Sequence, residues 1–307
     1  IYGWTKPVIE KIGGDTDAKV VYFNVYSSLN KAIGNEAWHQ QYINDYMSGN
    51  DIMEKAVEAA EATGDTVRIE YVRSLKGQLD MLFVQSGLAK CDMLVKIYGK
   101  DLEANKENIA FLQAMLDMFR NADCEKDPLY FKASKYLFAI KPTAASALGL
   151  AKEAMSANKN AEATEFLNKA ISLTSDKNIK ASCYYTLAVM SMNARQYSQS
   201  RAYCQKAMAE NPSMGSPLIL IAKMYAATAS SIFPGDALKQ RCVFYLVLDK
   251  LERARSIDSR VAGEAASLIA QYRRHLPSSS DVFMHPELDK GKSFYVGGWI
   301  GESTTIR

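Results

Sequence analysis

The side chains that most often carry catalytic or metal chemistry are few in this sequence and lie far apart. The three histidines are His39, His275 and His285, and none belongs to an HExxH or HxH motif or lies at a metal-binding spacing from a cysteine. The sequence also contains no GxSxG nucleophile motif and no GxxxxGK(S/T) phosphate-binding loop. We therefore predict that the protein is not an enzyme and has no catalytic residue, no metal site and no cofactor.

The cysteines allow two interpretations. Their positions are Cys91, Cys124, Cys183, Cys204 and Cys242, and they form no CxxC pair and no compact framework. The first interpretation is that they are small buried residues on helices. The second is that two of them form a disulfide, which requires an oxidising compartment. Both interpretations stay open at this point.

The composition is that of a folded soluble protein. The chain has 307 residues, of which 48% are hydrophobic and 23% charged, and its formal net charge is +3. A nearly neutral chain without clustered lysine and arginine gives no reason to expect a nucleic-acid partner. No window approaches the roughly 20 apolar residues that a membrane-spanning helix needs, so we expect no integral membrane segment.

Two stretches of the sequence resemble each other and indicate a helical repeat. "FLNKAISLTSD" (166–176) and "YCQKAMAENPS" (203–213) place Ala170 and Ala207 in matching contexts. Two antiparallel helices approach each other most closely where their side chains are small, which favours alanine at the crossing. Such a pair cannot bury its apolar face alone, so neighbouring pairs are expected to stack on it.

These stretches resemble the tetratricopeptide repeat (TPR) family. The unit 181–212 carries the pattern of that family most fully, and it departs from it at Ser191 and at Arg195, which stands in the usual glycine turn. Its matching residues are Tyr184, Leu187, Ala188, Tyr197, Ser200, Ala207 and Pro212. A weaker unit spans 144–175, and a third begins at Gly215. The resemblance implies an all-α fold, a right-handed α-solenoid of antiparallel helix pairs, to which the tail of the sequence adds a short C-terminal β-hairpin.

We expect four parts along the chain. Residues 1–17 are predicted to be a mobile N-terminal arm, and residues 18–143 to be degenerate helical repeats. Residues 144–276 are predicted to hold the TPR units, with an insertion near 228–241. Residues 277–307 are predicted to be a linker followed by the hairpin tail.

The tail "KSFYVGGWIGESTTIR" (292–307) is rich in residues that favour β-strands. Gly301–Glu302 is a candidate hairpin turn and Gly297–Gly298 a candidate bulge. A lone hairpin is only marginally stable in water, so this one must lie on another part of the protein or on a partner. Either it is a strap over the last helix of the array, or its edge binds a partner by strand addition.

The resemblance also implies a concave groove lined by the first helix of each repeat. The residues that map to this groove are Leu148, Lys152, Met155, Tyr185, Val189, Met192, Asn193, Ile219 and Lys223. Methionine and tyrosine side chains suit protein partners, so we expect Met155, Tyr185, Met192 and Ile219 to contribute most to binding. An alternative is that the groove is filled by the arm or the insertion of the protein itself.

We therefore predict a non-catalytic scaffold or adaptor that binds a segment of another protein in the TPR groove. The alternative is a small-ligand or glycan-binding envelope protein that uses Trp38, Tyr295 and Trp299 as stacking surfaces. The stretch "CDMLVKIYG" (91–99) and the tail are similar to those of uncharacterised TPR proteins of the Gram-negative cell envelope. This similarity implies a periplasmic or cell-envelope location and is compatible with association with a membrane complex. Because the chain begins at Ile1, removal of a leader is compatible with the sequence.

Overall fold

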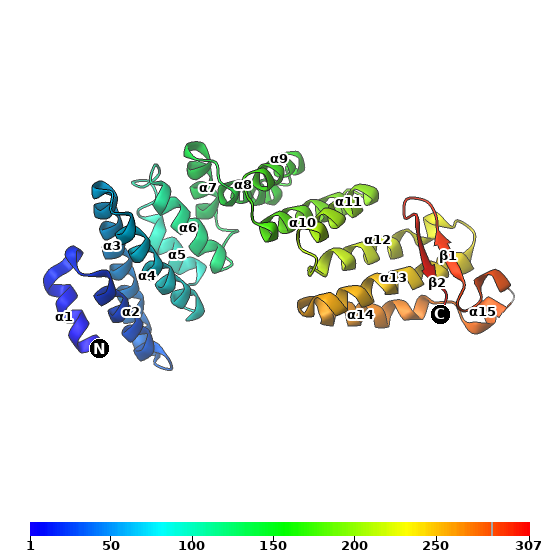
Figure 1. Cartoon of the computed structure of the whole chain (residues 1–307), viewed down its shortest axis with the longest axis horizontal. Helices are drawn as coiled ribbons and strands as arrows, with labels where there is room; N and C mark the ends of the chain where they lie inside the picture. Colours follow the sequence, from blue (N-terminus) through cyan, green and yellow to red (C-terminus); the bar gives the residue numbers. More distant parts are fainter. Residues whose placement is uncertain (284) are drawn as a thin grey trace. The chain divides into compact units, whose positions relative to one another are not determined.

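The computed structural model describes residues 1–283 and 285–307, which form α-helices and one small two-stranded antiparallel sheet (Figure 1). This architecture confirms the predicted helical class with a C-terminal hairpin. The contacts between residues divide the chain into two compact units, unit 1 (Ile1–Glu153) and unit 2 (Ala154–Arg307). Each unit contains a hydrophobic core of its own.

The elements follow one another in this order. The helices from the start of the chain through the end of unit 1 are α1 (Tyr2–Ile12), α2 (Ala18–Ala32), α3 (His39–Thr63), α4 (Thr66–Gln85), α5 (Cys91–Gly99), α6 (Ile109–Asn121), α7 (Pro128–Ile140) and α8 (Ala144–Ser156). The remaining elements are α9 (Asn160–Ser172), α10 (Lys177–Asn193), α11 (Tyr197–Glu210), α12 (Ser216–Ile232), α13 (Ala237–Ile257), α14 (Ala262–Tyr272), α15 (Ser279–Phe283), β1 (Ser293–Val296) and β2 (Glu302–Thr305). Short 3-10 helices lie at Gly13–Asp15, Glu36–Trp38, Ser259–Val261, Arg273–His275 and Pro286–Leu288.

Many of the helices begin where the local sequence supplies a capping residue. At these starts the side chain of an aspartate or asparagine accepts a hydrogen bond from a backbone N–H of the first turn. The capping residues are Asp17, Asp65, Asn108, Asp127, Asp176 and Asp236. Each cap satisfies a donor that the helix start leaves unpaired and stabilises the helix by about 1 kcal/mol.

Helix α1 is held against the other helices of unit 1 by polar contacts. The buried carboxylate of Asp45, on α3, accepts hydrogen bonds from Tyr2 Oη (2.8 Å), Lys6 Nζ (2.7 Å) and Ser28 Oγ (2.7 Å). A buried charge is costly unless it is paired and hydrogen-bonded, and α1 supplies two of these partners. Residues 2–12 are therefore an anchored helix, where we expected part of a mobile arm.

A disulfide links two of the cysteines in unit 1. Cys91 begins α5 and Cys124 follows α6, and the bond between them joins residues whose Cα atoms are 5.4 Å apart. Cys183, Cys204 and Cys242 are instead buried in helices of unit 2. Each of the two interpretations of the cysteines thus applies to a different part of the chain.

Helix pairs build most of unit 2. Helix α10 packs on α11, and α12 packs on α13 (Figure 1). Ala188, Ala207, Ala222 and Ala254 lie in these pairs and are fully buried, as the small-residue pattern predicts. Ser200 Oγ adds a hydrogen bond to the Ala188 carbonyl across the α10–α11 pair (2.7 Å).

The segment where we expected an insertion, near 228–241, belongs mostly to helices. Helix α12 continues to Ile232 and α13 begins at Ala237, so a short turn replaces most of the expected interruption. Thr228 and Ala229 are buried, which explains why the helix continues through this polar-looking stretch.

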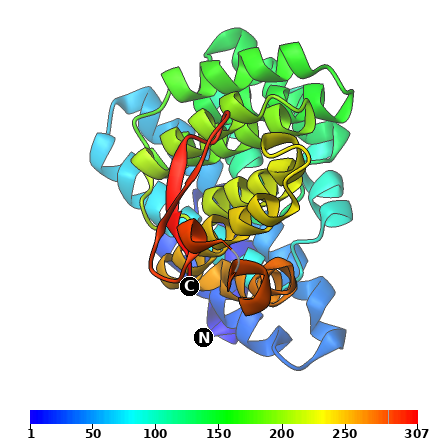
Figure 2. The same cartoon turned by 90° about the vertical axis from the view of Figure 1, so that its right-hand side faces the viewer.

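The C-terminal hairpin closes the core of unit 2. Its strands pair in an antiparallel register that sets Phe294 opposite Thr304, and Figures 1 and 2 show them, in red, beside the helices of this unit. Phe294, Val296 and Ile306 are buried in the core together with Ile300 of the turn. The turn lies between Val296 and Glu302, whereas we expected it at Gly301–Glu302. Gly298 and Gly301 adopt the positive φ angles that this turn requires.

Candidate functional site

Three of the predicted groove residues lie on α8. Leu148 and Lys152 belong to unit 1, whereas Met155 belongs to unit 2. Lys152 forms an ion pair with Glu125 of its own unit. Met155 is exposed and Leu148 is half-buried. The predicted groove is therefore drawn from both units.

Four more of these residues lie on α10. Tyr185, Val189 and Met192 are half-buried and pack against the core of unit 2, and burial raises the pKa of Tyr185. Asn193, at the end of the helix, is exposed. The large side chains of this set thus contribute to the packing of unit 2, and only their remaining exposed parts are accessible to a partner.

The last two predicted groove residues lie on α12. Ile219 is only 4% exposed and belongs to the core of unit 2, so its side chain is not available to a partner. Lys223 forms an ion pair with Glu264 of α14 at 2.7 Å.

The aromatic residues of the alternative hypothesis are divided between the two units. Trp38 is in unit 1, and its indole N–H donates to Ser28 Oγ at 3.2 Å. Trp299 is in unit 2, where it stacks on Tyr197 with ring centres 5.6 Å apart. Tyr295 is 63% exposed. Two of the three rings are therefore engaged in internal contacts.

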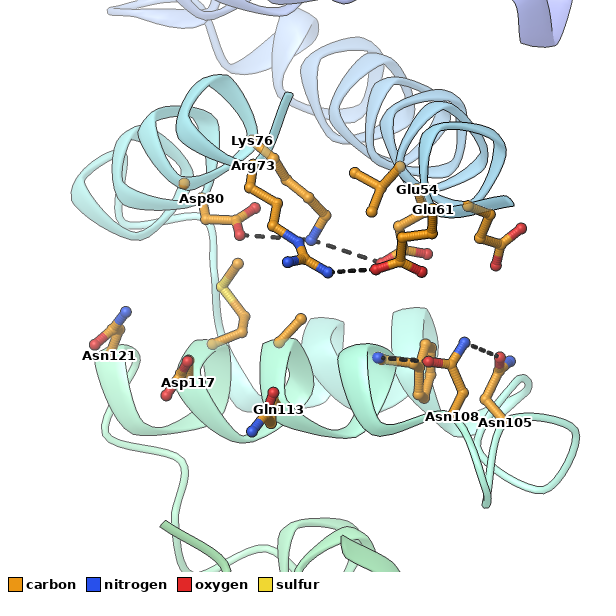
Figure 3. A pocket seen from close by; sticks show the side chains of 16 residues that line it. Glu54, Glu61, Arg73, Lys76, Asp80, Asn105, Asn108, Gln113, Asp117 and Asn121 are labelled. Atoms are coloured by element: carbon orange, nitrogen blue, oxygen red, sulfur yellow. Dashed lines mark hydrogen bonds and ion pairs between the residues drawn. The ribbon is translucent and has the colours of Figure 1, made fainter. Parts of the chain in front are cut away.

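A polar cleft of about 480 Å³ opens in unit 1 between α3, α4 and α6 (Figure 3). Most of the side chains around it are charged or carry amides. The lining residues are Glu54, Val57, Glu58, Glu61, Arg73, Lys76, Gly77, Asp80, Asn105, Asn108, Phe111, Gln113, Ala114, Asp117, Met118 and Asn121. Its volume falls within the range of small-molecule sites. We regard this cleft as the candidate functional site.

One wall of the cleft is a polar row on α6. Gln113, Asp117 and Asn121 are spaced four residues apart, so they lie on one face of the helix, about 6 Å apart along its axis. Asn108 caps the helix by accepting from the Phe111 N–H (3.1 Å), which fixes the start of this row. The wall therefore presents amide and carboxylate groups at regular intervals.

The opposite wall is formed by ion pairs between α3 and α4. Arg73 Nη2 lies 2.6 Å from Glu61 Oε1. Lys76 Nζ lies 3.6 Å from Glu54 Oε1 and 3.7 Å from Asp80 Oδ2. Figure 3 shows these side chains turned toward one another above the row on α6. Lys76 and its two partners are largely shielded from solvent, whereas Arg73 and Glu61 are about half exposed.

Negative charge predominates in the cleft. The lining includes the carboxylates of Glu54, Glu58, Glu61, Asp80 and Asp117, against the two cations of Arg73 and Lys76. Burial raises the pKa of Glu54 although the nearby lysine opposes this shift. A ligand that brings positive charge would therefore be favoured by this environment.

Gly77 leaves open space in the α4 wall. A Cβ atom added at this position would meet no other atom within 4 Å. A glycine inside a helix costs about 0.5–1 kcal/mol relative to alanine, so it is not there to stabilise α4. Its missing side chain instead keeps this part of the cleft empty.

The side chains that line the cleft are mostly charged groups and amides. Among the described residues that line it there is no histidine, cysteine, serine or threonine. Over residues 1–283 and 285–307, no group of three or more His, Cys, Asp or Glu side chains is arranged to hold a metal ion. The amides and charges that remain can donate and accept hydrogen bonds.

The residues of the cleft were not singled out in the sequence because each row looks like an ordinary solvated helix face. Glu54, Glu58 and Glu61 recur at helical spacing on α3, as do Arg73, Lys76 and Asp80 on α4. The available signal was that three neighbouring helices each carry such a row. Which rows face each other is decided by tertiary packing.

Comparison with known proteins adds no family. The chain matches no protein-family model and has no significant match among curated proteins. Among the described helices, none is both long enough and apolar enough to cross a membrane.

Proposed function

We propose that this protein is a non-catalytic scaffold that binds an extended segment of another protein, and that the cleft between α3, α4 and α6 holds this segment. The observation that carries the proposal is that the polar row of α6 and the ion-paired side chains of α3 and α4 line the same cleft. Amide side chains both donate and accept hydrogen bonds, as an extended main chain also does.

The dimensions of the cleft fit a short stretch of extended chain. Helix α6 has 13 residues and is about 20 Å long, which equals the length of about six residues in a β-strand conformation. Side chains on one face of an extended segment repeat every 6–7 Å, close to the spacing of about 6 Å between Gln113, Asp117 and Asn121. A segment that runs along α6 can therefore meet each of these groups in turn.

The finer architecture and the location belong to the same proposal. The pairs α10–α11 and α12–α13, with alanines at their crossings, support a right-handed TPR-like solenoid. The Cys91–Cys124 disulfide supports a periplasmic or other cell-envelope location, because disulfides persist in oxidising compartments. The groove predicted from the sequence has weaker support, since Ile219 is buried and Tyr185 packs on the core.

The test is site-specific photo-crosslinking in cells. A photoreactive amino acid replaces Gln113 inside the cleft or, as a control, Met81, which is exposed on α4 outside it. We expect a partner to be captured from position 113 and not from position 81. Gly77→Trp should abolish this capture by filling the cleft, whereas Gly77→Ala should leave it intact, because an added Cβ has room.

Circular dichroism of both Gly77 variants controls for folding. If Gly77→Trp folds normally and capture from position 113 is unchanged, the cleft is not the binding site and the proposal is wrong. If the photoreactive residue at position 113 captures no protein but one placed on α10 does, the groove predicted from the sequence is the site instead.

A further inference from the structure

We propose that the segment bound in the cleft of unit 1 carries basic side chains near both ends of the bound stretch, and that its main-chain carbonyls face Lys76 and Arg73 between them. This inference rests on the proposed function, since it specifies the chemistry of the segment that the cleft takes. It is carried by the distribution of charge along the cleft and by the hydrogen-bond donors of a buried lysine.

The charges alternate along the length of the cleft. Figure 3 shows the tips of Arg73 and Lys76 near the middle, with Asp80 on one side of them and Glu54 and Glu61 on the other. Both ends of the charged wall are thus acidic, and its centre is basic. A segment of uniform charge would meet repulsion somewhere along this wall, whereas one with cations at its two ends would not.

Two carboxylates remain for these cations. Glu58 forms no ion pair with any described residue, and it lies on α3 between Glu54 and Glu61. Asp117 pairs with Arg120, three residues along α6, at 2.7 Å, but both side chains are about half exposed. Such exposed pairs contribute little and exchange readily for another partner. Asp117 projects from α6 on the same side as Asp80, so it adds to the acidity of that end (Figure 3).

The burial of Lys76 is the second observation that supports the proposed segment. This residue is only 8% exposed, and its ammonium lies 3.6 and 3.7 Å from the carboxylates of Glu54 and Asp80. Both separations are those of ion pairs and are longer than an ordinary hydrogen bond. The ammonium has three N–H donors, and a carbonyl oxygen in the cleft would give it a further, shorter hydrogen bond beside these two carboxylates.

The cleft is acidic although the chain as a whole is not. The chain has a formal net charge of +3, yet five carboxylates face two cations in the cleft. A segment with positive charge would therefore be repelled weakly by the molecule as a whole and attracted at this one place. This contrast favours recognition by the cleft over general adhesion to the surface.

Peptide display tests the inference without assuming a sequence. A phage library of random linear dodecapeptides is selected on the full chain and, in parallel, on Gly77→Trp and Gly77→Ala. We expect peptides that require the open cleft to be enriched in lysine and arginine at two positions about four to six residues apart. We expect the same peptides from Gly77→Ala and their loss from Gly77→Trp.

The outcomes separate the inference from the proposed function. Peptides that depend on the open cleft but are neutral or acidic would overturn the basic-segment inference and leave the proposed function standing. If no selected peptide depends on Gly77, both are overturned. Peptides that are basic and lost from Gly77→Trp support both.

Charge variants then examine one selected basic peptide by fluorescence anisotropy. Glu58→Gln and Asp117→Asn should each weaken its binding about two- to fivefold at low salt, and less at high salt. Glu70→Gln, on an exposed part of α4 outside the cleft, should leave binding unchanged. Equal affinity for the wild type and both cleft variants would overturn the inference.

Discussion

Lys250 and Glu302 are 52 residues apart in the sequence and meet beside the turn of the C-terminal hairpin, where Lys250 Nζ donates a hydrogen bond to Glu302 Oε2 at 2.5 Å. The other carboxylate oxygen of Glu302 accepts from Tyr225 Oη, also at 2.5 Å. The first residue of β2 is thereby joined to both α12 and α13. This carboxylate is one polar anchor of a hairpin whose apolar side chains are buried in the core of unit 2, and Thr304 Oγ1 adds a hydrogen bond to Asp249 Oδ2 at 2.6 Å.

The anchor predicts a pH dependence of hairpin docking. Burial acts to raise the pKa of Glu302, but hydrogen bonds from Lys250 and Tyr225 outweigh it and hold the pKa below its ordinary value. A depressed folded-state pKa stabilises the fold above the ordinary glutamate pKa, and this stabilisation is lost as the pH falls through the folded value. We expect the fluorescence of Trp299, which stacks on Tyr197, to change in acid below about pH 4.

Glu302→Gln is the matched variant for this titration. It should remove that part of the pH dependence and lower the stability of unit 2 at neutral pH by about 1–3 kcal/mol, since the buried partners lose a charged acceptor. An identical acid titration of Trp299 in the wild type and the variant would contradict the assigned role of Glu302.

Gly215 lies where the surrounding atoms leave no room for a side chain. Its N–H donates to Asp258 Oδ2 at 3.0 Å, and an added Cβ would lie 2.7 Å from Val261 Cγ2 and 2.9 Å from the Ala254 carbonyl oxygen. Gly215→Ala should therefore destabilise unit 2 by about 1–3 kcal/mol in urea unfolding. Gly263→Ala, whose added Cβ has open space, should cause no comparable loss. Equal midpoints for the two variants would contradict the close approach.

The turn between α10 and α11 predicts a stabilising substitution. Arg195 has a φ angle of 59°, in the left-handed region that side chains with a Cβ avoid. Arg195→Gly should stabilise unit 2 by about 0.5–1 kcal/mol, measured as a higher melting temperature. Asn158 has a similar φ of 58°, but asparagine tolerates this region, so Asn158→Gly should gain less. A larger gain at Asn158 would contradict this ranking.

The disulfide predicts a redox-dependent stability of unit 1. The Cys91–Cys124 bond closes a loop with a sequence separation of 33 residues, and such a crosslink stabilises a fold by about 2–4 kcal/mol. Adding a thiol reductant should lower the denaturation midpoint of the wild type. The double variant Cys91→Ser/Cys124→Ser should show the lower midpoint with or without reductant. If the reductant lowers both proteins equally, the effect does not come from this bond.

Much of the secondary structure could be predicted because it depends on short-range patterns. The alternation of β-formers around Phe294 and the glycines before Glu302 indicated a hairpin, and the alanines at 188 and 207 indicated a close helix pair. The docking of α1 was not expected, because its anchor, Asp45, lies on a helix more than thirty residues away. Nothing near Lys6 in the sequence points to that carboxylate.

The cleft and the disulfide depend on contacts that a single sequence does not reveal. Arg73 and Glu61 look like solvated residues on two separate helices, and only the packing of α3 against α4 brings them together. In the same way, Cys91 and Cys124 lie on different elements with no motif between them. Ile219 was placed in a groove by analogy with a repeat, whereas its surroundings make it part of the core.

The position of the hairpin has a consequence for folding during synthesis. The carbonyl of Ile300 accepts a hydrogen bond from Arg201, 99 residues earlier, so the core of unit 2 is completed only after the hairpin, which follows its helices in the sequence, has been synthesised. Contacts of such long sequence separation form slowly. Until the hairpin packs, helices α10–α13 leave an apolar face exposed to solvent. Chaperones that recognise exposed apolar surface are expected to bind unit 2 mainly during this stage of folding.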